Sequence, residues 1–279
     1  MREIRSEDIT LAIKTMCIKA NCILERDVID KLNESYNVEV SPVGQEVLSQ
    51  ILENDDIASK SMVPICQDTG VAVVFVELGQ EVHVIGDINK AIHEGVRQGY
   101  KEGYLRKSIV ENPIYRKNTN DNTPAVIHIK IVPGDKIKIT VAPKGGGSEN
   151  MSRIKMLKPL EGKDGVKKFV IDTISRAGGN PCPPIVVGVG IGGTFEKAAL
   201  MAKEALIRPI NDHNSDPRIA ELEDELLREI NKLGIGPMGL GGRVTSLAVK
   251  INSYSCHIAS LPVAVNINCH AARHKTIIL

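Results

Sequence analysis

Residues 64–86, PICQDTGVAVVFVELGQEVHVIG, mark the point where the patterning changes from helical to strand-like. Residues 71–78 form a nearly continuous apolar run and residues 81–86 alternate, and both patterns are typical of β-strands. Before this stretch, roughly the first 60 residues carry apolar side chains at the 3.6-residue period of helices. We therefore expect a helical N-terminal region followed by a part that contains strands.

Further helices and strands are expected on both sides of this stretch. Ser6 could cap a helix that runs to about Cys22, and Ser41 followed by Pro42 is a good helix start. Helices are also predicted over 87–105, 161–177, 194–207 and 216–233, and strands in PIVVGVG, RVTSLAVKINSY, SLPVAVNINC and the terminal TIIL.

The segments PAVIHIKIV (124–132) and DKIKITVAP (135–143) alternate strictly and are separated by Pro133-Gly134, so we expect them to form a hairpin. Helices and strands follow one another in mixed order, which favours the α+β class. We expect one domain over residues 1–279, with a helical subregion (1–60) and a mixed part (61–279).

Bulk composition excludes several classes of protein. The chain has 279 residues, of which 42% are hydrophobic, 35 are basic and 34 are acidic. With no basic face and only 3% aromatic residues, nucleic acid is not an expected partner. No stretch approaches the ~18 apolar residues of a membrane span, and the first residues lack the apolar core of a signal peptide. We expect a cytoplasmic protein with no membrane segment.

The six cysteines fall into two groups. Cys17 and Cys22 lie in a segment with the apolar pattern of a helix, and we interpret them as buried, inert thiols. Cys66, Cys182 and Cys269 lie beside proline, glycine or an unusual polar cluster, and cytoplasmic thiols are not expected to pair as disulfides. Three dispersed thiolates favour a [4Fe–4S] cluster with one open iron that acts as a Lewis acid, because clusters that only transfer electrons usually have four cysteines.

Two of these cysteines lie in unusual turns. Pro64 and Gly70 bracket a turn that would present Cys66, Gln67 and Asp68 together, unless it is simply a surface turn. In GGNPCPP (178–184), the prolines would hold Cys182 rigidly, as a cluster ligand requires; a purely structural turn is the alternative.

The segment APKGGGSEN (142–150) carries three successive glycines directly after a predicted strand. Glycine allows close approach of the backbone, and several N–H groups can then point at an anion. The segment is not a Walker A loop, because the required Gly-Lys-Ser/Thr order is absent. Contact with a carboxylate or with cluster sulfide fits better than a triphosphate, and a flexible hinge is the alternative.

Gly188, Gly190 and Gly193 match the dinucleotide-binding pattern G-x-G-x-x-G. That fold needs a second strand ending in an acidic residue about 20 positions on. The sequence there is RPINDHNSDP, and no apolar strand precedes Asp212. A glycine-rich turn that packs closely against its neighbours is the favoured interpretation.

Two cysteines and three histidines lie within SCHIASLPVAVNINCHAARH (255–274), which raises the alternative of a zinc site. Each Cys-His pair is adjacent in sequence, and neighbouring strand residues point to opposite faces. Each pair would therefore offer one ligand at most, which is a poor arrangement for a closed zinc site.

Six segments in this order resemble the oxygen-sensitive, iron–sulfur class I fumarases and the α subunits of the related L-tartrate dehydratases. The segments are PICQDTG, LRKSIVENPIYRKNTNDNTP (105–124), APKGGGSEN, NPCPP, GPMGLGG (236–242) and CHAARH. The resemblance covers the chain from about residue 10 to its end. One departure is that His270 and His274 differ from the CSADR-type ending of many single-chain fumarases, which leaves the substrate open.

The resemblance implies roles for individual residues. Cys66, Cys182 and Cys269 match the cluster ligands, and Gln67 and Asp68 match residues that reach the substrate.

Three further positions match residues that bind the substrate. Arg106 matches an arginine that binds a substrate carboxylate, a glycine of the 145–147 run (taken as Gly146) matches a backbone contact, and His257 matches a substrate-contacting histidine. Asp68 is the candidate acid–base group at the departing hydroxyl, and His257 is the second candidate catalytic residue.

The implied activity is reversible hydration of fumarate to malate, with L-tartrate or a mesaconate-type acid as the alternative substrate. No obvious base for the C3 proton is found, and the chain ends where single-chain relatives continue into a second domain. We therefore expect a separate β subunit and an α₂β₂ complex. The rival from another class is a non-catalytic iron–sulfur sensor, which would have no need for Arg106, His257 or the glycine-rich loop.

Overall fold

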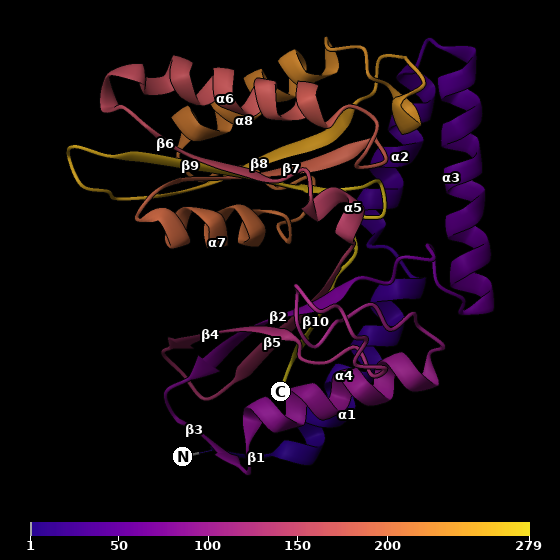
Figure 1. Cartoon of the computed structure of the whole chain (residues 1–279), viewed down its shortest axis with the longest axis vertical. Coiled ribbons are helices and arrows are strands. Elements are labelled where there is room, and N and C mark those ends of the chain that lie inside the picture. The colour runs from indigo at the N-terminus through magenta and orange to yellow at the C-terminus, as the bar shows by residue number, and fades with distance from the viewer. Residues whose placement is uncertain (1) are drawn as a thin grey trace. The chain divides into compact units, whose positions relative to one another are not determined.

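The computed structural model describes residues 2–279, and the chain divides into two compact units. Unit 1 comprises Met1–Glu25, Asn54–Gly146 and Arg273–Leu279, and unit 2 comprises Arg26–Glu53 and Gly147–Ala272. Helices and strands alternate in mixed order in the chain, which confirms the α+β class (Figure 1). In these residues no helix is both long enough and apolar enough to cross a membrane.

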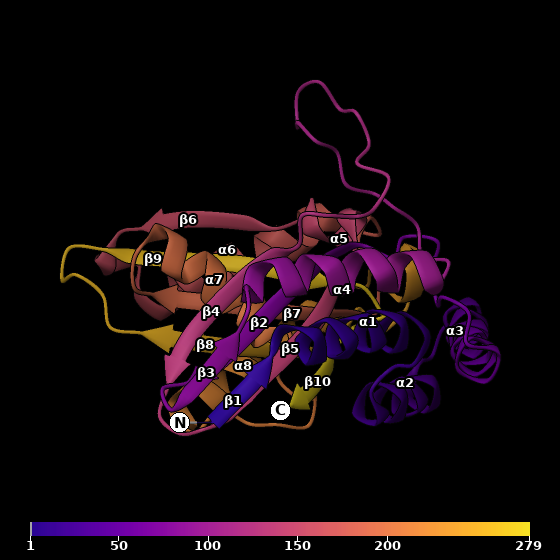
Figure 2. The same cartoon turned by 90° about the horizontal axis from the view of Figure 1, so that it is seen from below.

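Unit 1 contains a four-stranded sheet in the order β10-β5-β2-β4 and a two-stranded parallel sheet of β1 and β3. Its elements are β1 (Arg2–Arg5), α1 (Ser6–Cys22), β2 (Val71–Gly79), β3 (Val82–Ile85), α4 (Ile88–Glu102), β4 (Val126–Val132), β5 (Ile137–Lys144) and β10 (Lys275–Ile278). Helices α1 and α4 pack together and share one apolar core with β2 and β5. The long loop between α4 and β4 extends away from this sheet (Figure 2).

The predicted hairpin of residues 124–132 and 135–143 is wrong, although both strands exist. Strand β2 lies between them, parallel to β4 and antiparallel to β5. The physical reason is burial. Ala72, Val74 and their neighbours make β2 the most apolar strand of this sheet, and in the central position both of its edges are covered by neighbouring strands. Strand β4 is largely exposed and therefore occupies an edge.

Unit 2 contains the sheet β6-β9-β7-β8, in which β7 is parallel to β8 and antiparallel to β9. Its elements are α2 (Arg26–Val38), β6 (Arg153–Leu157), η1 (Pro159–Glu161), α6 (Gly162–Ala177), β7 (Ile185–Gly192), α7 (Phe195–Ala205), α8 (Pro217–Asn231), η2 (Pro237–Gly239), β8 (Ser246–Tyr254) and β9 (Leu261–Asn268). Helices α6 and α8 cover one face of the sheet and α7 covers the other (Figure 1). Helices α3 (Pro42–Ser61) and α5 (Gly146–Glu149) contain residues of both units.

The helical start of the chain is confirmed in α1, α2 and α3, and the helix starts follow from local hydrogen bonds. The Oγ of Ser41 accepts a 3.2 Å bond from the N–H of Gly44, so Ser41 caps α3 as predicted. Helix α1 begins at Ser6, but Arg5 occupies the cap position and makes no side-chain cap bond. Residues Arg2–Arg5 form β1, a strand that the sequence patterning did not indicate.

Gly188 and Gly190 explain the glycine pattern that resembles a dinucleotide site. A Cβ atom at either position would lie about 2 Å from a backbone carbonyl of α7, that of Ala202 or Ala198 respectively. Glycine therefore allows β7 and α7 to pack closely. Asp212 is not at a strand end and instead pairs with Arg208 at 2.9 Å. The interpretation of this motif as a packing feature is confirmed.

Candidate active site

In unit 1, the segment between α3 and β2 presents Cys66, Gln67 and Asp68 in a tight turn. The backbone N–H of Asp68 lies 3.4 Å from the Sγ of Cys66, and the same sulfur lies 3.7 Å from Oε1 of Gln67. Cys66 and Asp68 are half-buried, and Gln67 is exposed. The predicted grouping of a thiol, an amide and a carboxylate is therefore present in the structure.

Four side chains distant in sequence fix this turn by donating hydrogen bonds to its backbone carbonyls. The donors are Asn54 to Ile65 (2.9 Å), Arg273 to Asp68, Tyr100 to Thr69 (2.8 Å) and Asn122 to Gly70 (3.1 Å). Tyr100 and Asn122 are completely buried. Because buried carbonyls strongly require partners, these donors limit the turn to one conformation.

Both carboxylate oxygens of Asp68 accept backbone hydrogen bonds. Oδ1 accepts from the N–H of Gly70 at 3.0 Å, and Oδ2 accepts from the N–H of Gly146 at 2.8 Å. A Cβ atom at Gly145 would lie 3.2 Å from Oδ2, so a side chain at this position would crowd the carboxylate. The structure thus brings the first residues of the glycine-rich segment to the Cys66 turn.

Arg106 lies at the start of the long loop after α4. Its backbone carbonyl accepts a 3.1 Å bond from the hydroxyl of Thr69, so the Cys66 turn also fixes the position of Arg106. The side chain is exposed, and no carboxylate among residues 2–279 forms an ion pair with it. Its guanidinium is therefore available to bind a carboxylate ligand.

In unit 2, Cys182 and Cys269 lie at the same end of the sheet. Cys182 precedes β7 with φ +56°, and its N–H donates to the carbonyl of Gly179 at 3.0 Å. Its carbonyl accepts a 3.2 Å bond from the N–H of His270, the residue after Cys269. This proximity follows from the antiparallel register, which pairs Val186 near the start of β7 with Asn268 at the end of β9.

The glycine-rich segment 236–242 is anchored by Glu39. The carboxylate of Glu39 is 3% exposed and accepts hydrogen bonds from the N–H groups of Arg243 and Val244 at 2.8–2.9 Å. Desolvation alone would raise the pKa of Glu39, but these bonds and those from Ser41 and Val40 outweigh it and lower the pKa. The N–H of Met238 in this segment also donates a hydrogen bond to the carbonyl of Pro183, the residue after Cys182.

His257 and Cys256 lie at the opposite end of β9 from Cys269. Strand β9 has 8 residues, which at ~3.3 Å per residue separates the two ends by roughly 26 Å. His257 is exposed in the loop between β8 and β9 and lines a cavity of about 500 Å³ together with apolar side chains. Within one chain the structure does not bring His257 to Cys269, so no zinc centre can be formed by both Cys-His pairs.

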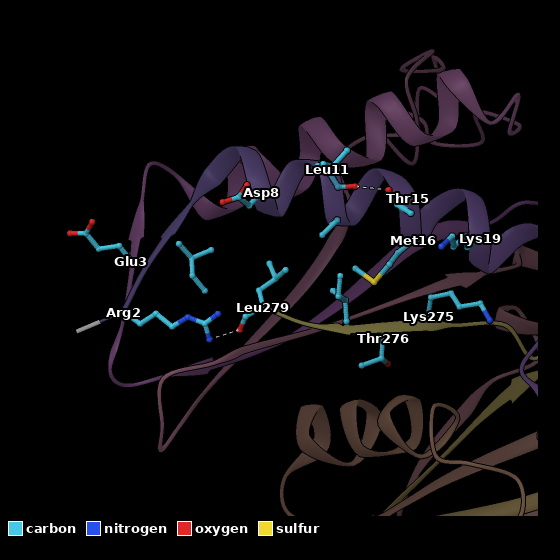
Figure 3. Close-up of a pocket in the computed structure, with 13 residues that line it drawn as sticks. Arg2, Glu3, Asp8, Leu11, Thr15, Met16, Lys19, Lys275, Thr276 and Leu279 are labelled. Carbon is cyan, nitrogen blue, oxygen red and sulfur yellow. Dashed lines mark hydrogen bonds between the residues drawn. The ribbon is translucent and has the colours of Figure 1, made fainter.

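A second cavity, of about 700 Å³, lies in unit 1 between α1, β1 and β10 (Figure 3). Its lining includes Leu11, Met16 and Leu279, and the carbonyl of Leu279 accepts a bond from Arg2 at 3.2 Å. None of the predicted site residues lines this cavity.

Burial separates the cysteines into the two groups that the sequence predicts. Cys17 and Cys22 are completely buried, and burial raises the pKa of Cys17 to about 12. Cys66, Cys182 and Cys269 are only half-buried and form no disulfide. Half-buried thiols, one with a backbone N–H at its sulfur, are a suitable donor set for an iron–sulfur cluster. Within residues 2–279 no three potential ligands are grouped in one place, and the triad is divided between unit 1 and unit 2.

The sequence reasoning missed the buried residues that support the Cys66 turn, chiefly Tyr100, Asn122 and Arg273. Arg273 belongs to the CHAARH segment, so that motif offered a signal. Tyr100 and Asn122 offered none, because a buried tyrosine in a helix or an asparagine in a polar loop is ordinary. Their roles depend on contacts with a turn about 30 to 50 residues away in sequence.

Comparison with known proteins identifies the family of this chain. The family model described as fumarate hydratase (fumerase) matches residues 10–278. A Methanocaldococcus jannaschii protein provisionally named L(+)-tartrate dehydratase subunit alpha is 47% identical over 91% of this chain and 92% of its own length. The L(+)-tartrate dehydratase subunit alpha of Escherichia coli K12 is 36% identical over 91% of this chain and 84% of its own. The chain belongs to the fumarate hydratase family and is a hydro-lyase.

Proposed function

We propose that this chain is the α subunit of a class I enzyme that reversibly hydrates fumarate to malate at a [4Fe–4S] cluster. Cys66, Cys182 and Cys269 would hold the cluster, and residues 1–279 would work as one domain. When bound, the cluster supplies one iron without a thiolate as a Lewis acid for the substrate hydroxyl. The enzyme would be cytoplasmic, where thiols stay reduced.

The geometry of Asp68 carries this proposal. The N–H groups of Gly70 and Gly146 fix its carboxylate two residues from the thiol of Cys66. A carboxyl group in a fixed position can give a proton to the departing hydroxyl when it is protonated, and can take one from the attacking water when it is ionised. A protein that only sensed oxygen would have no use for this arrangement.

The other site residues would bind and orient the dicarboxylate. The unpaired guanidinium of Arg106 would hold one carboxylate with two parallel hydrogen bonds. Gln67 and the backbone at Gly146 would contact the substrate beside Asp68. His257 remains in the proposed catalytic set because it matches the family motif, although it lies at the opposite end of β9 from Cys269.

We also propose that a separate β subunit completes the site in an α₂β₂ complex. The relatives named above are called alpha subunits, which supports a two-polypeptide enzyme. The base that removes the C3 proton would then come from the β subunit. Excluding water from the site would strengthen the electrostatic contributions of Asp68 and Arg106.

The second candidate function is dehydration of L-tartrate. The names of both relatives favour it, whereas the description of the family favours fumarate. A turnover screen of the complex over fumarate, malate, L-tartrate and mesaconate separates these possibilities. The highest kcat/KM identifies the substrate, and no turnover of any of the four contradicts the proposal.

A cysteine series tests the cluster. Replacing Cys66, Cys182 or Cys269 by serine should abolish bound iron and sulfide in protein purified without oxygen. Cys17→Ser, Cys22→Ser and Cys256→Ser should retain both. Loss of the cluster in Cys256→Ser with retention in Cys269→Ser would show that the third ligand is wrongly assigned. Air should inactivate the wild-type enzyme, and ferrous iron with thiol should restore it.

A further inference from the structure

The chain segment that carries Arg106 is held at three successive residues. Three polar side chains bond to its backbone, and each one holds a different residue of the segment. The contacts are the hydroxyl of Thr69 with the carbonyl of Arg106 (3.1 Å), Nδ2 of Asn118 with the carbonyl of Lys107 (2.9 Å), and Oδ1 of Asn122 with the N–H of Ser108 (2.7 Å). The backbone at the base of the Arg106 side chain therefore has one position relative to these three side chains.

Two of these side chains also join the segment to the Cys66 turn. Thr69 belongs to the turn itself and is 1% exposed. Asn122 is completely buried, and both ends of its amide are used, because its Nδ2 donates to the carbonyl of Gly70 at 3.1 Å. Buried polar groups strongly require partners, and a network in which they are paired is rigid. The Arg106 segment and the turn are therefore held together as one frame.

We propose that these three side chains are positioning residues that fix the spacing between Arg106 and Asp68, and that this spacing selects the length of the dicarboxylate that the enzyme accepts. This inference rests on the proposed function. Arg106 would bind one carboxylate of the acid while Asp68, the residue before Thr69, acts at the hydroxyl, so both groups contact one small molecule. A segment that is already held in place loses less conformational freedom when a ligand binds, and the affinity is correspondingly higher.

The test measures the Kd of succinate, a dicarboxylate that cannot react, by calorimetry on the anaerobic complex. Thr69→Val keeps the shape of the side chain but cannot donate to the carbonyl of Arg106, so it should raise the Kd roughly tenfold. Thr69→Ser keeps the hydroxyl and should bind succinate as the wild type does. The preference for succinate over glutarate, which is longer by one methylene, should fall in Thr69→Val.

Thr10→Val is the matched control. The hydroxyl of Thr10 also donates to a backbone carbonyl of unit 1, that of Ala91 at 3.1 Å, which is not part of the Arg106 segment. The Kd of succinate and the preference between the two acids should therefore be unchanged in Thr10→Val.

A double-mutant cycle with Arg106→Gln separates positioning from a general loss of structure. If Thr69 acts through Arg106, Thr69→Val should weaken succinate binding in the wild-type background and should add no further loss in Arg106→Gln. Equal losses in the two backgrounds would overturn the inference, and so would an unchanged preference between succinate and glutarate. Should Thr69→Val fail to fold, Asn118→Ala goes through the same cycle with the same outcomes. A wild-type complex that turns over none of the four acids would instead refute the proposed function.

Discussion

The backbone N–H of Gly146 donates a 2.8 Å hydrogen bond to Oδ2 of Asp68, which joins the glycine-rich segment to the Cys66 turn. The N–H of Gly70 holds the other oxygen at 3.0 Å. The carboxylate therefore has one orientation relative to the thiol of Cys66, and this orientation is the basis of the proposed acid–base role.

Asp68→Asn should lower kcat by roughly 10²- to 10⁴-fold, the usual contribution of a positioned acid–base group. The amide cannot accept and donate protons, and its NH₂ group cannot accept a bond from Gly146 or Gly70. Iron and sulfide content should stay at the wild-type level. Asp135→Asn, at an exposed turn of the same unit, is the control and should leave kcat unchanged. Wild-type kcat in Asp68→Asn would remove Asp68 from the catalytic set.

Tyr100→Phe should lower the free energy of unfolding by about 1–3 kcal/mol, because the buried carbonyl of Thr69 loses its donor. The looser Cys66 turn should also release iron faster in air. Urea unfolding and the rate of cluster loss measure the two effects. Tyr115→Phe serves as control, since Tyr115 is 83% exposed. Equal rates of cluster loss in both variants would show that Tyr100 does not position the turn.

Glu39→Gln should destabilise the chain by roughly 1.5–3 kcal/mol at neutral pH, the range for hydrogen bonds to a charged group. Backbone N–H donors lower the pKa of Glu39 below its ordinary value of 4.5 despite desolvation. Its contribution to stability is therefore fully present above pH 4.5 and is lost as the pH falls through the folded value. Unfolding curves of wild type and Glu39→Gln should converge in acid, while exposed Glu34→Gln should follow the wild type. A difference in the free energy of unfolding between wild type and Glu39→Gln that stays constant across pH would contradict this role of Glu39.

Asp55→Asn should stabilise the chain at high pH. Asp55 is 6% exposed, neither carboxylate oxygen has a partner among residues 2–279, and desolvation raises its pKa from 3.8 to about 7. Because the unfolded chain ionises first, the wild type should lose stability between pH 4 and 7, by up to about 4 kcal/mol at 1.36 kcal/mol per pKa unit. The variant should lack this loss. Parallel stability curves for the two proteins from pH 4 to 8 would show that Asp55 ionises normally.

The sequence was sufficient for features that depend on local patterning. The apolar run of β2, the Pro42 start of α3 and the turn that presents Cys66 all follow from residues within one element. The pairing of β4 with β2 rather than with β5 was not predictable in this way, because it depends on which strand buries most apolar surface in the folded sheet.

In the candidate site, too, local motifs were predictable from the sequence and contacts between distant residues were not. Motif order indicated Cys182 and Cys269 as partners, and the register of β7 with β9 places them together. The distance from His257 to Cys269 could not be read from a motif, since it is set by the length of the strand between them. The donors Tyr100 and Asn122 act on carbonyls distant in sequence, and a hydrogen bond to a backbone carbonyl leaves no mark in composition or spacing.

Mössbauer spectroscopy of iron-enriched, anaerobically purified complex tests the central claim most directly. A cluster held by Cys66, Cys182 and Cys269 should give about four irons per chain, with one iron distinct from the others. Adding fumarate or L-tartrate should change the spectrum of that one iron and leave the other three unchanged. Protein without iron, or four irons that do not respond to either acid while the complex turns over, would contradict the account.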